Sequence, residues 1–489
     1  MSTSTTGVVG AKPGNTTIIV AVLAFAGIVV ALMQTLVIPL IPQLPTLLNT
    51  SAANTAWVVT ATLLAGAVAV PVMGRLGDMF GKRRLLLVGL GLLVLGSVIG
   101  ALSSSVVPLI VGRSFQGLAA GVIPLGISVM RDVLPTEKLA GSVAMMSASL
   151  GVGGALGLPA AALIAEYADW HFLFWTSAAL GVVVIGLVLA SVPESDVRAG
   201  GSFDFLGALS LSTGLITLLL AISKGSTWGW TSALTIAMLV VSLAAFAFWA
   251  WWELHTALPL VDIRVTIGRQ VLFTNLASIS IGFALFAMSL VFPQVLQLPG
   301  STGYGLGQSI LAAGLVMAPS GVIMMLVAPL SARITTSKGP KTTLMAGALV
   351  IAAGYLIGVF TLSAVWLLVL ISIVIGAGIG LAYGAMPALI MGAVPPSETG
   401  AANSFNTLMR SLGTSFASAV AGVILAQMTI SAGGVSVPSE AAFHVTMAVA
   451  AGAAVLAFVL AAFIPRFKGS PSTAVNTSTA PSEPTPARH

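Results

Sequence analysis

The sequence predicts an all-α integral membrane protein with fourteen transmembrane helices, arranged as two six-helix bundles with two linker helices between them. Composition gives the first reason: 57% of the residues are hydrophobic, only 7% are charged, and the mean hydropathy is +1.08. Soluble proteins carry about 25% charged residues, so this chain has too few charges to cover a surface that faces water. Three further observations support this fold class: the long apolar stretches, the distribution of basic residues and an internal repeat.

Each predicted span is an apolar stretch of about 20 residues, which is the length that an α-helix needs to cross the hydrocarbon core. The first is too long for a signal peptide and is not followed by a small-residue cleavage site, so we expect it to be a retained helix. The fourteen stretches are 17–38, 54–73, 85–104, 107–130, 139–165, 171–192, 205–223, 230–252, 270–292, 307–330, 342–361, 364–393, 399–429 and 441–464.

Lysine and arginine orient these spans. If the N-terminus is cytoplasmic, sixteen of the 19 basic residues fall in cytoplasmic loops or tails. Lys224 is the one basic residue in a loop on the outer side of the membrane. Arg113 and Arg410 lie within spans. This bias is typical of plasma-membrane proteins with positively charged inner loops, and it predicts that both termini are cytoplasmic. The net charge of +6 therefore has a topological cause, and we expect no nucleic-acid partner.

An internal repeat divides the chain. The segment "PVMGRLGDMFGKR" from Pro71 aligns without a gap with "PLSARITTSKGPK" from Pro329, and each follows the second span of its half. Parallel six-helix halves are one known transporter architecture. We therefore predict a cytoplasmic tail (1–16), an N-terminal bundle (17–192), two linker helices (205–252), a C-terminal bundle (270–464) and a disordered cytoplasmic tail (465–489).

Three motifs resemble those of the major facilitator superfamily. "GRLGDMFGKRR" at 74–84 is similar to its signature between helices 2 and 3, and "RSFQGLAAG" at 113–121 to its helix 4 motif. "GVGGALGLPAA" at 151–161, with Gly153, Gly157 and Pro159, resembles the helix 5 motif of antiporters. With fourteen spans, the chain resembles the fourteen-helix drug:proton antiporter branch.

The chain departs from that branch at two places. Leu158 separates Gly157 from Pro159, and alanines follow where paired glycines are usual. The first span has Gln34 near the position where these exporters commonly carry an aspartate.

The resemblance implies a secondary active transporter that exports hydrophobic drugs or an endogenous metabolite in exchange for protons. An uptake symporter of the same fold is the alternative. A membrane enzyme or sensor is a more distant one, because the sequence shows no clustered catalytic side chains and no soluble output domain. There is no phosphate-binding Walker motif, no cysteine and no histidine cluster, so we expect neither ATP hydrolysis nor a metal or cofactor. The expected partners are a small hydrophobic or cationic substrate, protons and lipid, with the chain as a monomer.

By the same resemblance, Gly74, Asp78, Gly81 and Arg83 form a conformational gate. We expect the glycines of the motif to form a tight turn, and Asp78 to dock near the start of the thirteenth span around Ser397–Thr399, where a helix N-terminus favours an anion. Thr336 replaces the aspartate in the repeat, which predicts a gate on one half only.

Charged and polar residues within spans are candidates for proton coupling or the substrate path, because such residues are costly in a bilayer. Arg113, Glu166 and Arg410 are the coupling or cavity candidates, chosen from a few ionisable groups that also include Asp78, Asp132 and His171. Gln34, Asn275, Asn403 and Asn406 are the substrate-path candidates, with hydrogen bonding between helices as the alternative. The spacing of Asn403, Asn406 and Arg410 places them on one helix face.

Overall fold

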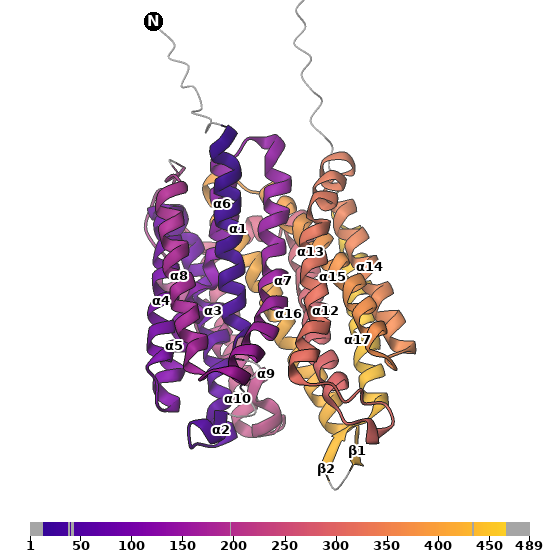
Figure 1. Cartoon of the computed structure of the whole chain (residues 1–489). Coiled ribbons are helices and arrows are strands. Elements are labelled where there is room, and N and C mark those ends of the chain that lie inside the picture. Colours follow the sequence, from indigo (N-terminus) through magenta and orange to yellow (C-terminus); the bar gives the residue numbers. More distant parts are fainter. Residues whose placement is uncertain (1–12, 38–39, 41–43, 196, 433–434, 466–489) are drawn as a thin grey trace, which may run out of the picture.

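The computed structural model describes residues 13–37, 40, 44–195, 197–432 and 435–465. Within these residues, fourteen helices are long and apolar enough to cross a membrane, which confirms the predicted number. They form two groups that lie side by side (Figure 1). Most of the predicted tails falls outside the described residues. We call the end of the bundle that carries residues 78–84 the motif end; α1 begins there and α17 ends there (Figure 1).

The first bundle contains six spans. The apolar stretch predicted for the second span ended at residue 73. In the structure, α3 continues to Phe80, so residues 74–80 belong to the same helix. A 3₁₀ turn at Ala119–Gly121 joins α5 and α6 into one span. The helices are α1 (Pro13–Thr35), the short α2 (Leu44–Leu47), α3 (Ala52–Phe80), α4 (Lys82–Ala101), α5 (Val106–Leu118), α6 (Val122–Val133), α7 (Thr136–Tyr167) and α8 (His171–Ser191).

The linker pair and the second bundle follow. The linker helices are α9 (Phe205–Trp228) and α10 (Ala233–His255), with the short α11 (Ile263–Thr266) after them. A two-stranded antiparallel hairpin that the sequence did not predict, β1 (Thr429–Ala432) and β2 (Val435–Pro438), pairs Thr429 with Pro438. The second bundle contains α12 (Arg269–Gln297), α13 (Ile310–Lys338), α14 (Pro340–Phe360), α15 (Val365–Met391), α16 (Thr399–Gln427) and α17 (Glu440–Ala462).

The sequence repeat has a structural counterpart at the turns that end α3 and α13. Gly81 has a φ of 112° and Gly339 a φ of 87°, and the alignment pairs these two residues. Backbone at such angles strains any residue with a Cβ atom. Each glycine lets a long helix end and the next helix begin one residue later. The two bundles therefore have equivalent corners at these glycines.

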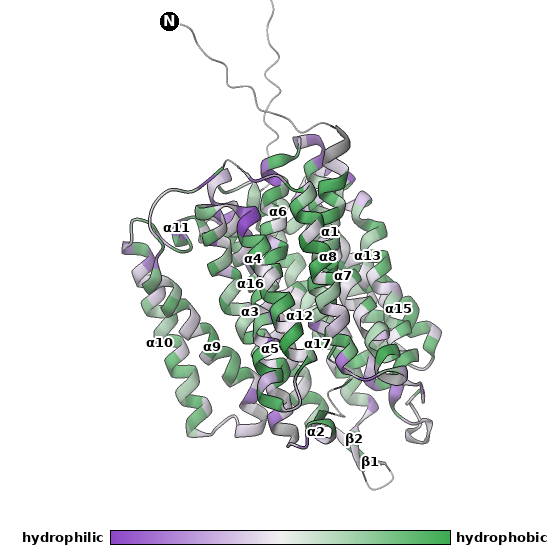
Figure 2. Cartoon of the chain, turned by 60° about the vertical axis from the view of Figure 1, so that its left-hand side comes forward, coloured by the Kyte–Doolittle hydropathy of each residue, from purple (hydrophilic) through white to green (hydrophobic). Residues whose placement is uncertain are grey.

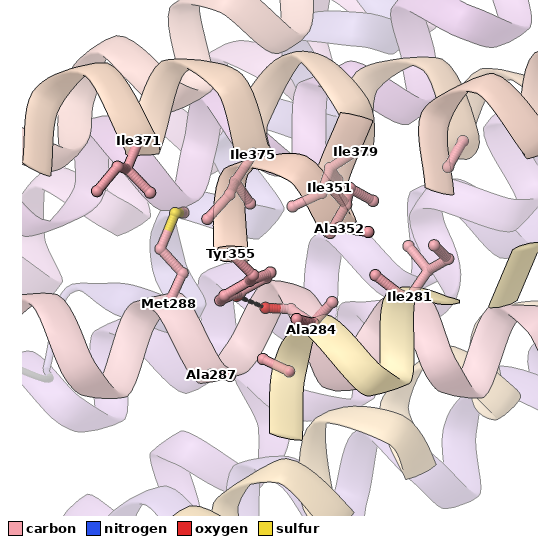
Figure 3. Packing of buried hydrophobic residues seen from close by; sticks show 14 of the residues in the cluster. Ile281, Ala284, Ala287, Met288, Ile351, Ala352, Tyr355, Ile371, Ile375 and Ile379 are labelled. Atoms are coloured by element: carbon pink, nitrogen blue, oxygen red, sulfur yellow. Dashed lines mark hydrogen bonds between the residues drawn. The ribbon is translucent and has the colours of Figure 1, made fainter. Parts of the chain in front are cut away.

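Each bundle has its own apolar core. In the second, Tyr355 lies among Met288, Ile351 and Ile375, and its hydroxyl donates to the carbonyl of Ala284 (Figure 3). A third apolar cluster attaches the linker pair: Leu211 and Trp249 pack with Ala67 of α3 and Phe405 of α16. α9 and α10 therefore lie on one flank of the molecule, where apolar residues predominate (Figure 2).

Candidate functional site

Asp78 lies near the end of α3, fully buried, and joins the two bundles. Its Oδ1 accepts the backbone N–H of Gly400 at 3.1 Å, and its Oδ2 accepts that of Ala401 at 2.8 Å. Both donors belong to the first turn of α16, where backbone N–H groups have no partner within the helix and the helix dipole favours an anion. The contact lies just past the Ser397–Thr399 segment expected from the sequence.

Gly74 lies one turn before Asp78 and faces the same helix. A Cβ atom at this position would lie 2.7 Å from the carbonyl oxygen of Gly400 and would also collide with Ser404. The expectation that the motif glycines form a turn is therefore wrong for Gly74 and Gly77, which are helical residues of α3. Gly74 instead allows α3 and α16 to approach closely, and only Gly81 makes the turn.

Lys82 is buried beside Asp78. Its Nζ lies 2.6 Å from Oδ2 of Asp132 and 3.7 Å from Oδ1 of Asp78. The hydroxyl of Ser195 donates to the same Asp132 oxygen. In the sequence, Lys82 is one of the sixteen basic residues expected in cytoplasmic loops or tails, but the structure places it between two carboxylates. Because a buried charge without a partner is strongly destabilising, this cluster ties α3, α4, α6 and the segment after α8 into one unit.

Arg131 makes a second connection between the bundles. At the end of α6, its guanidinium donates to the hydroxyl of Thr399 and, at 3.1 Å, to the carbonyl of Val394. Sequence reasoning counted Arg131 only as a basic loop residue, and nothing in its local pattern indicated a partner so distant in the chain. We call Asp78, Gly74 and Arg131, with the first turn of α16, the latch.

Arg83 faces a different neighbour. Its guanidinium donates to the carbonyl of Leu189 at 2.8 Å, and its backbone N–H to Glu194 at 3.3 Å. The structure therefore places Arg83 against the end of α8 and the segment that follows, and does not bring it to α16.

Arg113 lies buried in α5 and connects this helix to the end of α1. Its Nη1 donates to the carbonyl of Met33 at 2.8 Å and to Oε1 of Gln116 at 2.7 Å, and its Nη2 reaches the carbonyl of Gln34 at 3.4 Å. Gln116 in turn donates to the hydroxyl of Ser97. Arg113 and Gln34 are thus brought together through the Gln34 backbone, while the Gln34 side chain is exposed.

Arg410 lies in the second bundle with its guanidinium over the ring of Tyr383, at 4.6 Å from the ring centroid. Its Nη2 donates to the hydroxyl of Thr407 at 3.1 Å, and its buried Nη1 has no partner among the described residues. The sequence offered no carboxylate for this charge, and the structure supplies an aromatic face, which stabilises a buried cation by about 2 kcal/mol.

The predicted polar face of α16 meets α12. The amide of Asn406 donates to Oδ1 of Asn275 and to the hydroxyl of Ser278, both at 2.8 Å. Asn403 donates to the carbonyl of Thr399 on its own helix. One amide atom each of Asn275 and Asn403 is buried without a partner in the described part of the chain. Such atoms usually have a partner, often an ordered water.

The helix 5 motif is part of α7, and two of its glycines face α1. A Cβ atom at Gly153 would lie 2.5 Å from the carbonyl oxygen of Ile28, and one at Gly157 would collide with Thr35. Both glycines therefore permit close contact between these helices, and Pro159 lies inside α7.

Glu166 falls in the last turn of α7, but its side chain lies outside the described part of the structure. Nearby, the backbone N–H of His171 donates to Asp169 at 2.9 Å and lowers the pKa of that carboxyl. The His171 ring contacts the carbonyl of Ser103 at 2.9 Å. These groups lie beyond α7, at the end away from the motif.

The family model of the Major Facilitator Superfamily matches residues 23–418 and 276–489. The chain belongs to the major facilitator superfamily. This confirms the family expected from the three motifs.

Two relatives are similar to this chain in sequence, and one solved structure is similar to it in fold. An uncharacterised MFS-type transporter of Mycobacterium tuberculosis is 28% identical over 88% of this chain, and the chain spans 64% of that protein's length. The tetracenomycin C resistance and export protein of Streptomyces glaucescens is 28% identical over 85% of this chain and 76% of its own. The human organic anion transporter MFSD10 has the same fold, with a TM-score of 0.65 at 15% identity over 92% of this chain and all of the other.

Proposed function

We propose that this superfamily member is a proton-coupled exporter of hydrophobic or cationic small molecules, working by alternating access. The observation that carries the proposal is the latch: a buried carboxylate of one bundle held by the first turn of α16 in the other. Two bundles that rock about a central site need a contact that closes one end and can be released. The relative named for tetracenomycin C resistance and export supports the direction of transport.

We further propose that the motif end faces the cytoplasm. The positive-inside distribution of lysine and arginine supports this orientation, as does the presence of Lys82, Arg83 and Arg84 at the start of α4. The conformation described here is then closed toward the cytoplasm. Arg113, Arg410 and the asparagines of α12 and α16 are the proposed lining of the transport path, because they place buried polar atoms within the spans.

The test is efflux from cells that lack their own drug pumps. Cells that express the chain are loaded with ethidium, and loss of fluorescence is followed with and without a proton uncoupler. We expect efflux that stops when the uncoupler collapses the proton gradient. Efflux that continues in the uncoupler contradicts proton coupling, and faster ethidium accumulation than in cells with an empty vector indicates uptake instead. Cells expressing Glu440→Gln, an exposed acid outside the proposed path, serve as the matched control.

A further inference from the structure

Glu253 is a buried acid of the linker pair that the proposed function does not use. It lies near the end of α10 with 3% of its surface exposed. Its Oε1 accepts the indole N–H of Trp249 at 2.8 Å and a longer contact from the Val261 N–H at 3.4 Å. Its Oε2 is buried with no hydrogen-bond partner among the described residues. The backbone N–H of Leu260 also lies near the carboxyl group, but Oε2 has no hydrogen bond of normal geometry in the described part of the chain to stabilise a negative charge.

The charged groups around Glu253 do not neutralise it. The nearest is another acid: a Cβ atom at Gly207 would meet the carboxylates of both Asp204 and Glu253. Asp204 has donors of its own, since it caps the Gly207 N–H at 2.8 Å and accepts the Trp252 indole at 3.0 Å. No ion pair involving Glu253 occurs in the described part of the chain. The other ionisable groups on the packed elements are Lys224 (α9), His255 (α10), Asp262 and Arg264 (at α11), Arg75 and Asp78 (α3), and Glu398 and Arg410 (before and on α16).

An ionised carboxylate in this place is costly. Burial without a cation or a full set of donors disfavours the charged form of an acid, and so does a neighbouring carboxylate. A neutral carboxyl group, with its proton on Oε2, avoids both penalties. The geometry therefore favours a proton on Glu253 in this conformation.

The Glu253 environment is connected to the latch through one aromatic contact. The Trp249 ring that donates to Glu253 stacks on Phe405 of α16, with ring centroids 6.2 Å apart and planes inclined by 21°. Phe405 lies one helical turn after Ala401, the partner of Asp78. If α16 moves away when the latch opens, Phe405 no longer stacks on the ring of Trp249, the residue that donates to Glu253. Two pockets lie in this part of the molecule, one lined by Val261 and Phe405 and the other by Asp204 and Trp252, and Glu253 itself lines neither of them in the closed conformation.

We propose that Glu253 is a proton-binding site of the linker helices, and that its proton is held when the latch is closed and released when it opens. A group that binds a proton more tightly in one conformation stabilises that conformation at low pH and ceases to do so as the pH rises. Over the pH range in which Asp78 of the latch stays ionised, the latch is therefore closed at the acidic end and opens as Glu253 ionises. The inference rests on the proposed alternating movement of the bundles, but it requires no particular substrate.

Infrared spectroscopy of the purified protein in nanodiscs tests the proton directly. The difference spectrum between acidic and alkaline pH should contain the carbonyl stretch of a protonated carboxyl group. We expect Glu253→Gln to lose this band and Asp204→Asn, the neighbouring acid with its own donors, to retain it. Trp249→Phe keeps an aromatic ring but removes the donor to the carboxylate, so it should move the pH midpoint of the band upward. A spectrum in which Glu253→Gln loses no band overturns the proposal.

A distance across the latch tests the coupling. The chain has no cysteine, so spin labels at Arg84→Cys and Ser337→Cys report the separation of the bundles by pulsed electron paramagnetic resonance. We expect the closed population to fall as the pH rises in the otherwise native protein, and to stay high at every pH in Glu253→Gln. A pH response unchanged by Glu253→Gln, or no response in the native background, overturns the coupling. Neither measurement depends on efflux, so failure of the proposed transport activity would be seen separately.

Discussion

Asp78 and Ala401 lie 323 positions apart in the sequence, and a 2.8 Å hydrogen bond joins the carboxylate of the first to the backbone N–H of the second. With the parallel contact from Gly400, it connects α3 of the first bundle to α16 of the second. The donors are backbone groups that any helix leaves unpaired at its start. The latch therefore depends on the position and direction of α16 more than on the side chains there.

Asp78→Asn should weaken the latch without unfolding the protein. Asparagine has the same shape, but its NH₂ group must face one of the two N–H donors, and it carries no charge to pair with Lys82. Hydrogen bonds to a charged group contribute about 1.5–3 kcal/mol, so we expect a fall in ethidium efflux of about tenfold or more. Membrane abundance, measured by immunoblot, should not change. Efflux equal to that of the native chain at equal abundance would exclude Asp78 from the gate.

Gly74→Ala should prevent the latch from closing. The added methyl group meets the Gly400 carbonyl and Ser404, and backbone cannot move aside as a flexible side chain can. We expect the label distance between positions 84 and 337 to shift toward the open population. Gly91→Ala is the matched control, because a Cβ atom there meets nothing within 4 Å and alanine favours a helix. An equal effect of both substitutions would mean that the contact with α16 is not the cause.

Lys82→Met should destabilise the first bundle. It removes the cation between Asp78 and Asp132 and leaves two buried carboxylates, and breaking a buried ion pair in this way costs about 3–5 kcal/mol. We expect a clear fall in the thermal unfolding temperature of the detergent-solubilised protein. Adding Asp132→Asn should restore part of it, because one of the orphaned charges is then gone. Lys338→Met, at an exposed lysine that ends α13, should have little effect; a loss as large as that of Lys82→Met would contradict the assignment.

The ring of Tyr383 should matter more than its hydroxyl. Arg410 lies over the face of that ring, so Tyr383→Phe keeps the contact and Tyr383→Leu removes about 2 kcal/mol of stabilisation for a buried cation. We expect near-native efflux from the first variant and strongly reduced efflux from the second and from Arg410→Ala, all at equal membrane abundance. Native efflux from Arg410→Ala would remove this residue from the transport path.

Sequence reasoning succeeded where one residue type at one place has a single physical meaning. The apolar stretches predicted fourteen spans because the bilayer thickness sets a helix length. The repeat aligned Gly81 with Gly339, and the structure shows that both adopt φ values that only glycine takes without strain. Sequence reasoning failed at Gly74 and Gly77, because glycine tolerates a turn and a close helix contact equally well. Only the neighbouring helix, α16 at Gly74 and α6 at Gly77, distinguishes the two roles.

Sequence reasoning also failed to predict which charged side chains are buried. Lys82 and Arg131 were indistinguishable in sequence from the other basic residues near span ends, yet one is sealed between two carboxylates and the other reaches Thr399 across the bundles. Glu253 gave no signal beyond one acid at the edge of an apolar stretch. Its partners Trp249 and Val261 are close in sequence, but Phe405, which covers Trp249, is not.

The sequence by itself determined the membrane class, the number of spans, the repeat and the family, because hydrophobic length, charge distribution and short motifs are local properties of the chain. Only the tertiary structure decided which charges face each other, where α3 and α16 touch, and which acid lies buried without a cation. The contacts between α3 and α16 join segments more than 300 residues apart, and several of the contacts use backbone N–H and carbonyl groups. Such groups are present at every position, so only the packing of the helices selects the ones that act.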